Sequence, residues 1–185
     1  SAIKTDVLDK KLATVTVTKP GAGIIQGGLF WQYYEDLDKI KSSETYISIT
    51  KELYRKIKTE NGEELQKITA TTPLKVGDKV TVRMILNTDR NMEFIHLKDM
   101  RAAGFEPLDV ISGYQWKNNL GYYQSTKDAS TNFYIEYMPK GKYVFEYDLV
   151  CNASGTFSNG ISTLKNYYAP QMNAHTKGTK VSISE

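Results

Sequence analysis

Hydrophobic and polar residues alternate with a period of two along several stretches of the chain. Residues 79–86 read Lys-Val-Thr-Val-Arg-Met-Ile-Leu, and residues 143–151 read Tyr-Val-Phe-Glu-Tyr-Asp-Leu-Val-Cys. In an extended backbone the second stretch places Tyr143, Phe145, Tyr147 and two further apolar side chains on one face. The pattern predicts two half-buried β-strands.

Residues 45–58 carry a more ambiguous pattern. Leu53 and Ile57 have the i,i+4 spacing of a helix, but Ile47, Ile49 and Leu53 also fit the alternation of a strand. The dipeptide Asn61-Gly62 favours a tight hairpin turn, with residues 65–69 as the returning strand. We therefore interpret this region as a hairpin. The remaining predicted strands cover residues 12–18, 29–35, 93–98, 132–137, 156–157, 161–164 and 180–184.

Turn-forming residues separate these predicted strands. All five prolines fall between them, where the missing N–H weakens no strand ladder. The polar stretch 35–44 indicates a linker and a domain boundary. Closely spaced strands without a convincing amphipathic helix predict an all-β protein with antiparallel sheets packed as a β-sandwich, and with extra N-terminal strands before the linker.

Composition narrows the functional classes. The 185 residues are 40% hydrophobic, which is typical of a globular chain, and 24 Lys and Arg against 21 Asp and Glu give a net charge of only +3. The basic residues are scattered, which argues against nucleic acid as a partner. No apolar run is long enough for a membrane-spanning helix, so we expect no direct membrane insertion. The start, residues 1–4, lacks the apolar centre of a signal peptide.

Residues suited to catalysis or metal binding are sparse. His96 and His175 lie far apart in sequence, outside any zinc-ligand pattern, and no Asp-x-Asp-x-Asp-Gly calcium loop is present, although calcium is harder to exclude than zinc. The single cysteine, Cys151, continues the apolar face of its strand and is interpreted as a small core residue. We expect no catalytic residue, no metal and no cofactor. A small hydrolase would need a pocket that joins a carboxylate to His96 or His175.

Aromatic residues provide the first candidate interaction surface. Adjacent residues in a strand point to opposite faces, so in Trp31-Gln32-Tyr33-Tyr34 some rings must face solvent or another module. We predict that Trp31, Tyr33 and Tyr34 belong to an inter-domain or partner surface. A carbohydrate-binding module using Trp31, Trp116 and the tyrosine pairs is the alternative. Several coplanar rings exposed on one face would favour it.

A charged cluster provides the second candidate. Asp89-Arg90-Asn91-Met92-Glu93 is followed by Asp99-Met100-Arg101, and ion pairs among these residues could fix a loop at a strand end. The other interpretation is a partner-facing patch that contains Arg90, Asp99 and Arg101.

The ordered series of segments resembles the C-terminal end of bacterial alpha-2-macroglobulin-like proteins. The matching segments are residues 29–38 (Leu-Phe-Trp-Gln-Tyr-Tyr-Glu-Asp-Leu-Asp), 77–83, 89–93, 99–107, 140–147, 155–157 and 168–172. The series covers most of the chain, and its specificity comes from the order of the segments, since no single motif is diagnostic. The resemblance implies that residues 1–43 are C-terminal strands of a CUB-like module and residues 44–185 the final macroglobulin-like domain.

The resemblance also implies a function. Such a chain would be a non-catalytic structural and interaction part of a bacterial endopeptidase inhibitor in the cell envelope, which traps a protease after bait cleavage. Its direct partners would be other domains of the same parent chain, chiefly the thioester-domain region, and its indirect partner the trapped protease. The family's thioester arises from a Cys-x-x-Gln type motif, whereas Cys151 is followed by Asn152-Ala153-Ser154. The trapping chemistry is therefore not assigned to these residues.

Overall fold

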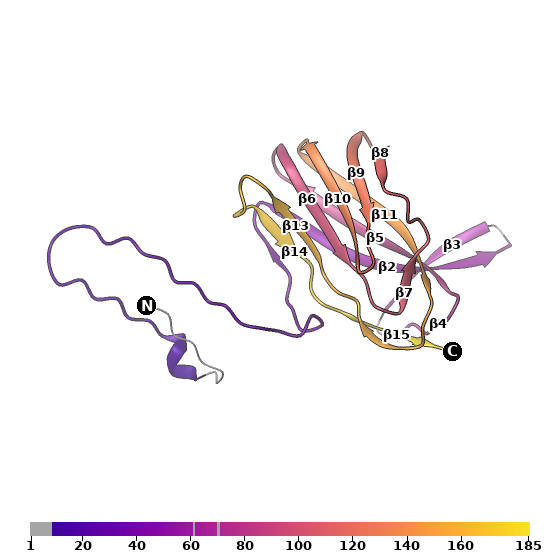
Figure 1. The fold of residues 1–185 in the computed structure, drawn as a ribbon, viewed down its shortest axis with the longest axis horizontal. Helices are drawn as coiled ribbons and strands as arrows, with labels where there is room; N and C mark the ends of the chain where they lie inside the picture. Colours follow the sequence, from indigo (N-terminus) through magenta and orange to yellow (C-terminus); the bar gives the residue numbers. More distant parts are fainter. Residues whose placement is uncertain (1–8, 61, 70) are drawn as a thin grey trace. The chain divides into compact units, whose positions relative to one another are not determined.

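The computed structural model describes residues 9–60, 62–69 and 71–185 (Figure 1). The chain divides into two compact units, Ser1–Tyr34 and Glu35–Glu185. The second unit contains the β-strands.

The N-terminal unit contains a short 3-10 helix, η1 (Lys10–Ala13). The Asp9 side chain caps it by accepting a 2.9 Å hydrogen bond from the Lys11 amide. The strands predicted at residues 12–18 and 29–35 are wrong, because residues 14–34 form no strand. Their alternation supplies strand propensity, but a strand also needs a partner ladder. The assignment of residues 1–43 to a CUB-like module stays a prediction.

The C-terminal unit is almost entirely β-structure. Its strands are β1 (Ser43–Glu44), β2 (Ile47–Thr59), β3 (Gly62–Lys67), β4 (Leu74–Lys75), β5 (Lys79–Thr88), β6 (Met92–Met100), β7 (Phe105–Pro107), β8 (Gly113–Lys117), β9 (Leu120–Thr126), β10 (Ser130–Met138), β11 (Gly141–Cys151), β12 (Gly155–Ser158), β13 (Ser162–Asn166), β14 (Asn173–His175) and β15 (Lys180–Ser184).

These strands form three sheets (Figure 1). The seven-stranded sheet has the order β1-β14-β13-β6-β10-β9-β8, the five-stranded sheet β3-β2-β5-β11-β7, and a small sheet β12-β15-β4. All pairings are antiparallel except β15 with β4. The prediction of an all-β antiparallel sandwich is confirmed.

The core lies between the two larger sheets. Phe133 of the seven-stranded sheet packs against Phe145 and Tyr147 of the five-stranded sheet, with ring centroids 5.1 and 6.3 Å apart. The Tyr122 ring contacts both phenylalanines at 5.7 and 5.1 Å. Burial of aromatic rings is the largest apolar contribution a side chain can make, so this cluster holds the sheets together.

Most strands predicted for the C-terminal unit are confirmed. Residues 47–59 and 62–67 form the expected hairpin, although Asn61 of its turn lies outside the described residues. The strand predicted at residues 93–98 extends through Met100, and residues 105–107 form β7, a strand that was not predicted. Pro107 thus lies in a strand rather than in a break. It ends an edge strand, where its missing N–H costs no ladder bond.

Residues 35–42, at the start of the C-terminal unit, pack against the segment that leads into β15. The Gly178 amide donates to the Ile40 carbonyl at 2.8 Å, and Lys180 pairs with Asp38 at 2.9 Å. A Cβ atom on Gly178 would lie 1.7 Å from the Leu37 carbonyl oxygen. Glycine is therefore required there for the segment to lie against the strand region. No helix of the described residues is long and apolar enough to cross a membrane.

Candidate interaction surface and buried polar cluster

Aromatic side chains form a continuous row across the outer face of the seven-stranded sheet. Strand register places Tyr114 opposite Tyr123, Tyr123 opposite Tyr134, and Tyr134 opposite His96. Directly paired residues of antiparallel strands share a face. These four residues, from β8, β9, β10 and β6, are called the aromatic row below.

The four rings of the aromatic row pack in two pairs. Tyr114 meets Tyr123 edge to face at 5.1 Å and 73°, whereas His96 and Tyr134 are parallel within 3° at 4.8 Å. The Tyr167 ring, just after β13, stacks on His96 at 6.0 Å. Because parallel rings so close together cover each other's faces, they present edges and polar tips outward.

A second group of aromatic rings lies near the N-terminal end of β6. Phe94 packs edge to face on Tyr168 at 5.0 Å, and the Arg90 guanidinium lies 4.4 Å from the Tyr46 ring centroid. Tyr46 and Phe94 have φ of 62° and 53°, a left-handed backbone that is unusual for bulky residues. A shallow hollow of about 370 Å³, lined by Arg90, Phe94, Tyr168 and other residues, lies here.

A buried polar cluster joins the two larger sheets. Asp99 of β6 is fully buried. It pairs with the Lys51 ammonium of β2 at 2.8 Å and accepts hydrogen bonds from the hydroxyls of Tyr147 at 2.5 Å and Ser162 at 2.7 Å. Lys51 also donates to the carbonyls of Met100 and Asn159. Each charge is compensated, as a buried ion pair requires.

Burial raises the pKa of the Tyr147 hydroxyl well above its ordinary value, and the negative charge of Asp99 adds to the shift. The phenol is therefore held in its neutral, hydrogen-donating form. Lys51, Asp99, Tyr147 and Ser162 come from four strands of both sheets. The cluster fixes how the sheets are aligned.

Arg101 is buried beside this cluster and binds the turn between β9 and β10. Its guanidinium donates to the Thr131 hydroxyl at 3.1 Å and to the carbonyls of Ser130 at 3.0 Å and Asp128 at 3.3 Å, and it also contacts the Lys127 carbonyl. The acceptors are neutral oxygens. Loop fixation thus uses carbonyl groups rather than the ion pairs expected from sequence.

The six residues predicted to form a partner surface fall into separate places. Trp31, Tyr33 and Tyr34 are 52%, 66% and 106% exposed in the N-terminal unit. The Arg90 guanidinium is exposed and bound to Asp89 at 2.8 Å. The surface prediction is wrong for Asp99 and Arg101, which are 0% and 7% exposed, because their charges are satisfied inside the domain.

The aromatic row was not predicted as a surface. Neighbouring residues of a strand point to opposite faces, so Tyr122 lies in the core while Tyr123 lies on the outer face. The β8–β9 hairpin that aligns the row was missed. Its signal is Asn118-Asn119, both at positive φ of 52° and 62°, which is the backbone of a two-residue type I′ turn.

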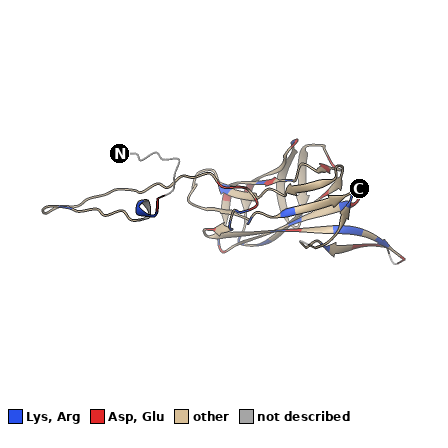
Figure 2. Cartoon of the chain, turned by 90° about the horizontal axis from the view of Figure 1, so that it is seen from below, with Lys and Arg blue, Asp and Glu red and all other residues tan. Residues whose placement is uncertain are grey.

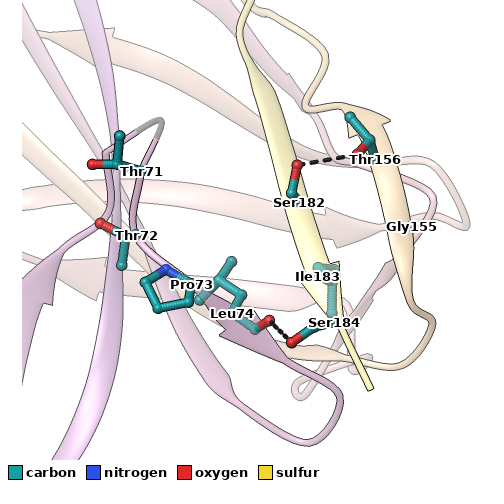
Figure 3. A pocket seen from close by; sticks show the side chains of 9 residues that line it. All are labelled: Thr71, Thr72, Pro73, Leu74, Gly155, Thr156, Ser182, Ile183 and Ser184. Carbon is teal, nitrogen blue, oxygen red and sulfur yellow. Dashed lines mark hydrogen bonds between the residues drawn. The ribbon is translucent and has the colours of Figure 1, made fainter.

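Charged and ionisable groups form no evident catalytic centre in the part of the chain that is described. Figure 2 shows basic and acidic residues interspersed along the strands, and the described residues contain no group of three or more His, Cys, Asp or Glu able to hold a metal ion. A cavity of about 410 Å³ lies beside the small sheet. Hydroxyl groups of Thr156, Ser182 and Ser184 line it, without an ionisable side chain (Figure 3).

Cys151 is buried in the core, as predicted. Burial, with a smaller contribution from Asp78, raises the pKa of its thiol from 9.0 to about 11. A protonated, enclosed thiol is a poor nucleophile.

We expect Cys151 to resist iodoacetamide at about pH 8 in the folded chain and to react readily in urea. The stability gained by burying the neutral thiol is fully present below the unfolded pKa of 9.0 and is lost as the pH rises toward about 11. Mass spectrometry of labelled protein measures the reaction. Equal labelling rates in the folded and the urea-unfolded chain would contradict the burial.

Comparisons with known proteins agree with this fold. Residues 47–171 match the family model "Bacterial Alpha-2-macroglobulin MG10 domain". The structure is similar to a mutant of Salmonella alpha-2-macroglobulin, with a TM-score of 0.63 and 15% identity over 79% of this chain and 10% of that one. It is also similar to native Escherichia coli alpha-2-macroglobulin from domain MG7 to the C-terminus, with a TM-score of 0.61 and 11% identity over 78% and 24%.

One curated relative, Circularly permutated Ras protein 2 of Dictyostelium discoideum, is 23% identical over 121 residues, which are 65% of this chain and 3% of that protein. The chain thus spans a small part of the proteins it matches. At these identities the solved structures establish the fold alone.

Proposed function

Since the chain belongs to the bacterial alpha-2-macroglobulin MG10 domain family, we propose that it is a non-catalytic structural and interaction domain of a bacterial protease trap. In this proposal residues 44–185 are the macroglobulin-like domain and residues 1–43 are the C-terminal segment of a CUB-like module, whose strands form only when the rest of that module is present to pair with them. The parent protein lies in the bacterial cell envelope. The direct partners are other domains of that protein, including the thioester-domain region, and the trapped protease is an indirect partner.

The aromatic row carries the proposal. Tyrosine combines a large apolar ring with a polar tip, and protein interfaces are enriched in it. Tyr114 is 86% exposed and Tyr134 39%, so the rings are accessible. Lys165 pairs with His96 across β13 and β6, and Lys98 lies two residues further along β6. These two lysines place positive charge on one side of the row, whereas the exposed Glu136 follows Tyr134 by two residues on β10, so the row is bordered by charges of both signs that can pair with a neighbouring protein surface.

Ring geometry distinguishes this surface from a sugar-binding platform. A sugar stacks on the exposed face of an aromatic ring, but His96 and Tyr134 cover each other's faces. Tyr114 and Tyr123 stand edge to face at 73° and so do not form one plane. The arrangement supports contact with a protein more strongly than contact with a carbohydrate.

The N-terminal unit carries a separate proposed surface of its own. Trp31, Tyr33 and Tyr34 expose their rings, and we assign them to contacts with the neighbouring module. Arg90 belongs to the same proposal on the C-terminal unit, because its pairing with Asp89 and its position over Tyr46 hold the guanidinium in place at the surface.

Cross-linking of the native parent protein, followed by mass spectrometry, tests the proposal. We expect inter-domain cross-links from Lys98 and Lys165, at the aromatic row, to a neighbouring domain. Lys142 serves as the matched control because it lies on β11, in the other sheet. Inter-domain links from Lys142 but none from the two lysines beside the row would contradict the proposed surface.

A further inference from the structure

The outer strands of the two larger sheets differ in how they are protected against pairing with another strand. β1 has only two residues, β7 is short and ends in Pro107, and β3 carries Glu63, Glu64 and Lys67 with every residue exposed. Short length, proline and charge are the usual protections of a sheet edge. β8, the outer strand beside β9, has five residues, no proline and one charge, at its end.

The free hydrogen-bonding groups of β8 can be assigned from its hairpin. Lys117 pairs with Leu120 across a two-residue turn. This closing pair exchanges hydrogen bonds, so alternate residues bond to β9 and the residues between them, Tyr114 and Trp116, point their N–H and C=O groups outward. No backbone hydrogen bond outside the strand ladders, within the described ranges, involves either residue.

These outward groups are complementary to a second copy of β8. When two copies of β8 pair antiparallel about a two-fold axis at Gln115, Tyr114 of each chain lies opposite Trp116 of the other chain. Each such pair exchanges two backbone hydrogen bonds, and both rings lie on the same outer face. Lys117 falls opposite Gly113, so no like charges meet.

The side chains at this edge are also unusually accessible. Tyr114 and Trp116 are 86% and 74% exposed, and Val110 and Ile111, which precede the strand, are 65% and 77% exposed. Trp116 lies over Gly121, where a Cβ atom would be 2.9 Å from the indole ring. That contact orients the indole within the hairpin of a single chain.

We propose that two copies of this chain associate through β8, joining their seven-stranded sheets into one continuous sheet. The pairing uses the strand edge, whereas the function proposed above uses the face of the sheet. Tyr114 takes part in both, but the pairing is measured by self-association and by the amides of β8, and the proposed function by inter-domain cross-links, so the failure of one is distinguishable from the failure of the other.

Sedimentation of the 185-residue chain over a concentration series tests the association. We expect a monomer–dimer equilibrium that Tyr114→Pro weakens about tenfold or more, because two of four backbone donors and both aromatic pairs are lost. Proline is tolerated there because only the outward N–H is removed. Tyr114→Thr and Tyr168→Thr form a matched pair of variants, since each removes a highly exposed ring, the first on the β8 edge and the second away from it.

Amide hydrogen exchange gives the most specific result. In the dimer we expect the Tyr114 and Trp116 amides to become protected, while Gln115, which bonds to β9, is protected in monomer and dimer alike. Circular dichroism of Tyr114→Pro checks that the domain stays folded. A monomer at all concentrations, a dimer unaffected by Tyr114→Pro, or protection of these two amides only by a different polypeptide would overturn the proposal.

Discussion

Replacing Asp99 with asparagine is expected to lower the free energy of unfolding by about 3–5 kcal/mol. The substitution keeps the size of the side chain but leaves the Lys51 ammonium buried, since that lysine side chain is only 6% exposed. It also weakens the acceptor of the Tyr147 and Ser162 hydroxyls. Urea unfolding followed by far-UV circular dichroism, which reports the loss of the sheets, measures the change.

Two variants separate the buried charge from a general effect of removing an acid. Asp89→Asn breaks an exposed ion pair with Arg90 and should leave stability close to wild type. Lys51→Met combined with Asp99→Asn should recover part of the loss, because no unpaired charge remains. If Asp99→Asn alone changes stability by less than about 1 kcal/mol, the cluster does not fix the two sheets.

Replacing Phe133 with alanine is expected to cost about 3–5 kcal/mol. The ring is 1% exposed and contacts aromatic rings of both sheets, so its loss opens a cavity at the centre of the sandwich. The same urea titration gives the free energy.

Tyr134 supplies the matched control, because it is the next residue along β10 and points to the opposite face. Tyr134→Ala should cost about 1 kcal/mol or less, the range of one cross-strand pair. Equal losses for the two variants would mean that β10 is not oriented with Phe133 inward.

Alternation along the chain predicted the strands that have partners. The residues of β5 and β11 bury alternate side chains in register with each other, and this periodicity can be read directly from the order of apolar and polar residues. The same reasoning was wrong at residues 12–18 and 29–35, since strand propensity does not say whether a second strand is present. Whether a partner strand is present depends on the whole fold and not on the local sequence.

The candidate surface was harder to predict for a similar reason. The aromatic row joins residues from four strands, and its existence depends on registers that one sequence does not reveal. Asp99 and Arg101 were assigned to a surface because charged residues are usually exposed. Their burial depends on Lys51 and on the carbonyls of residues 127–130, far away in the sequence.

The most direct measurement of the central claim is the mass of the polypeptide that carries this segment in the source cell. An antibody raised against residues 44–185 would detect it on a denaturing blot of the envelope fraction. A band several times larger than 20.9 kDa is the predicted result, since the matched solved chains are about four to ten times longer than the aligned segment. A single band near 20.9 kDa would contradict the account of a domain working within a larger protease trap.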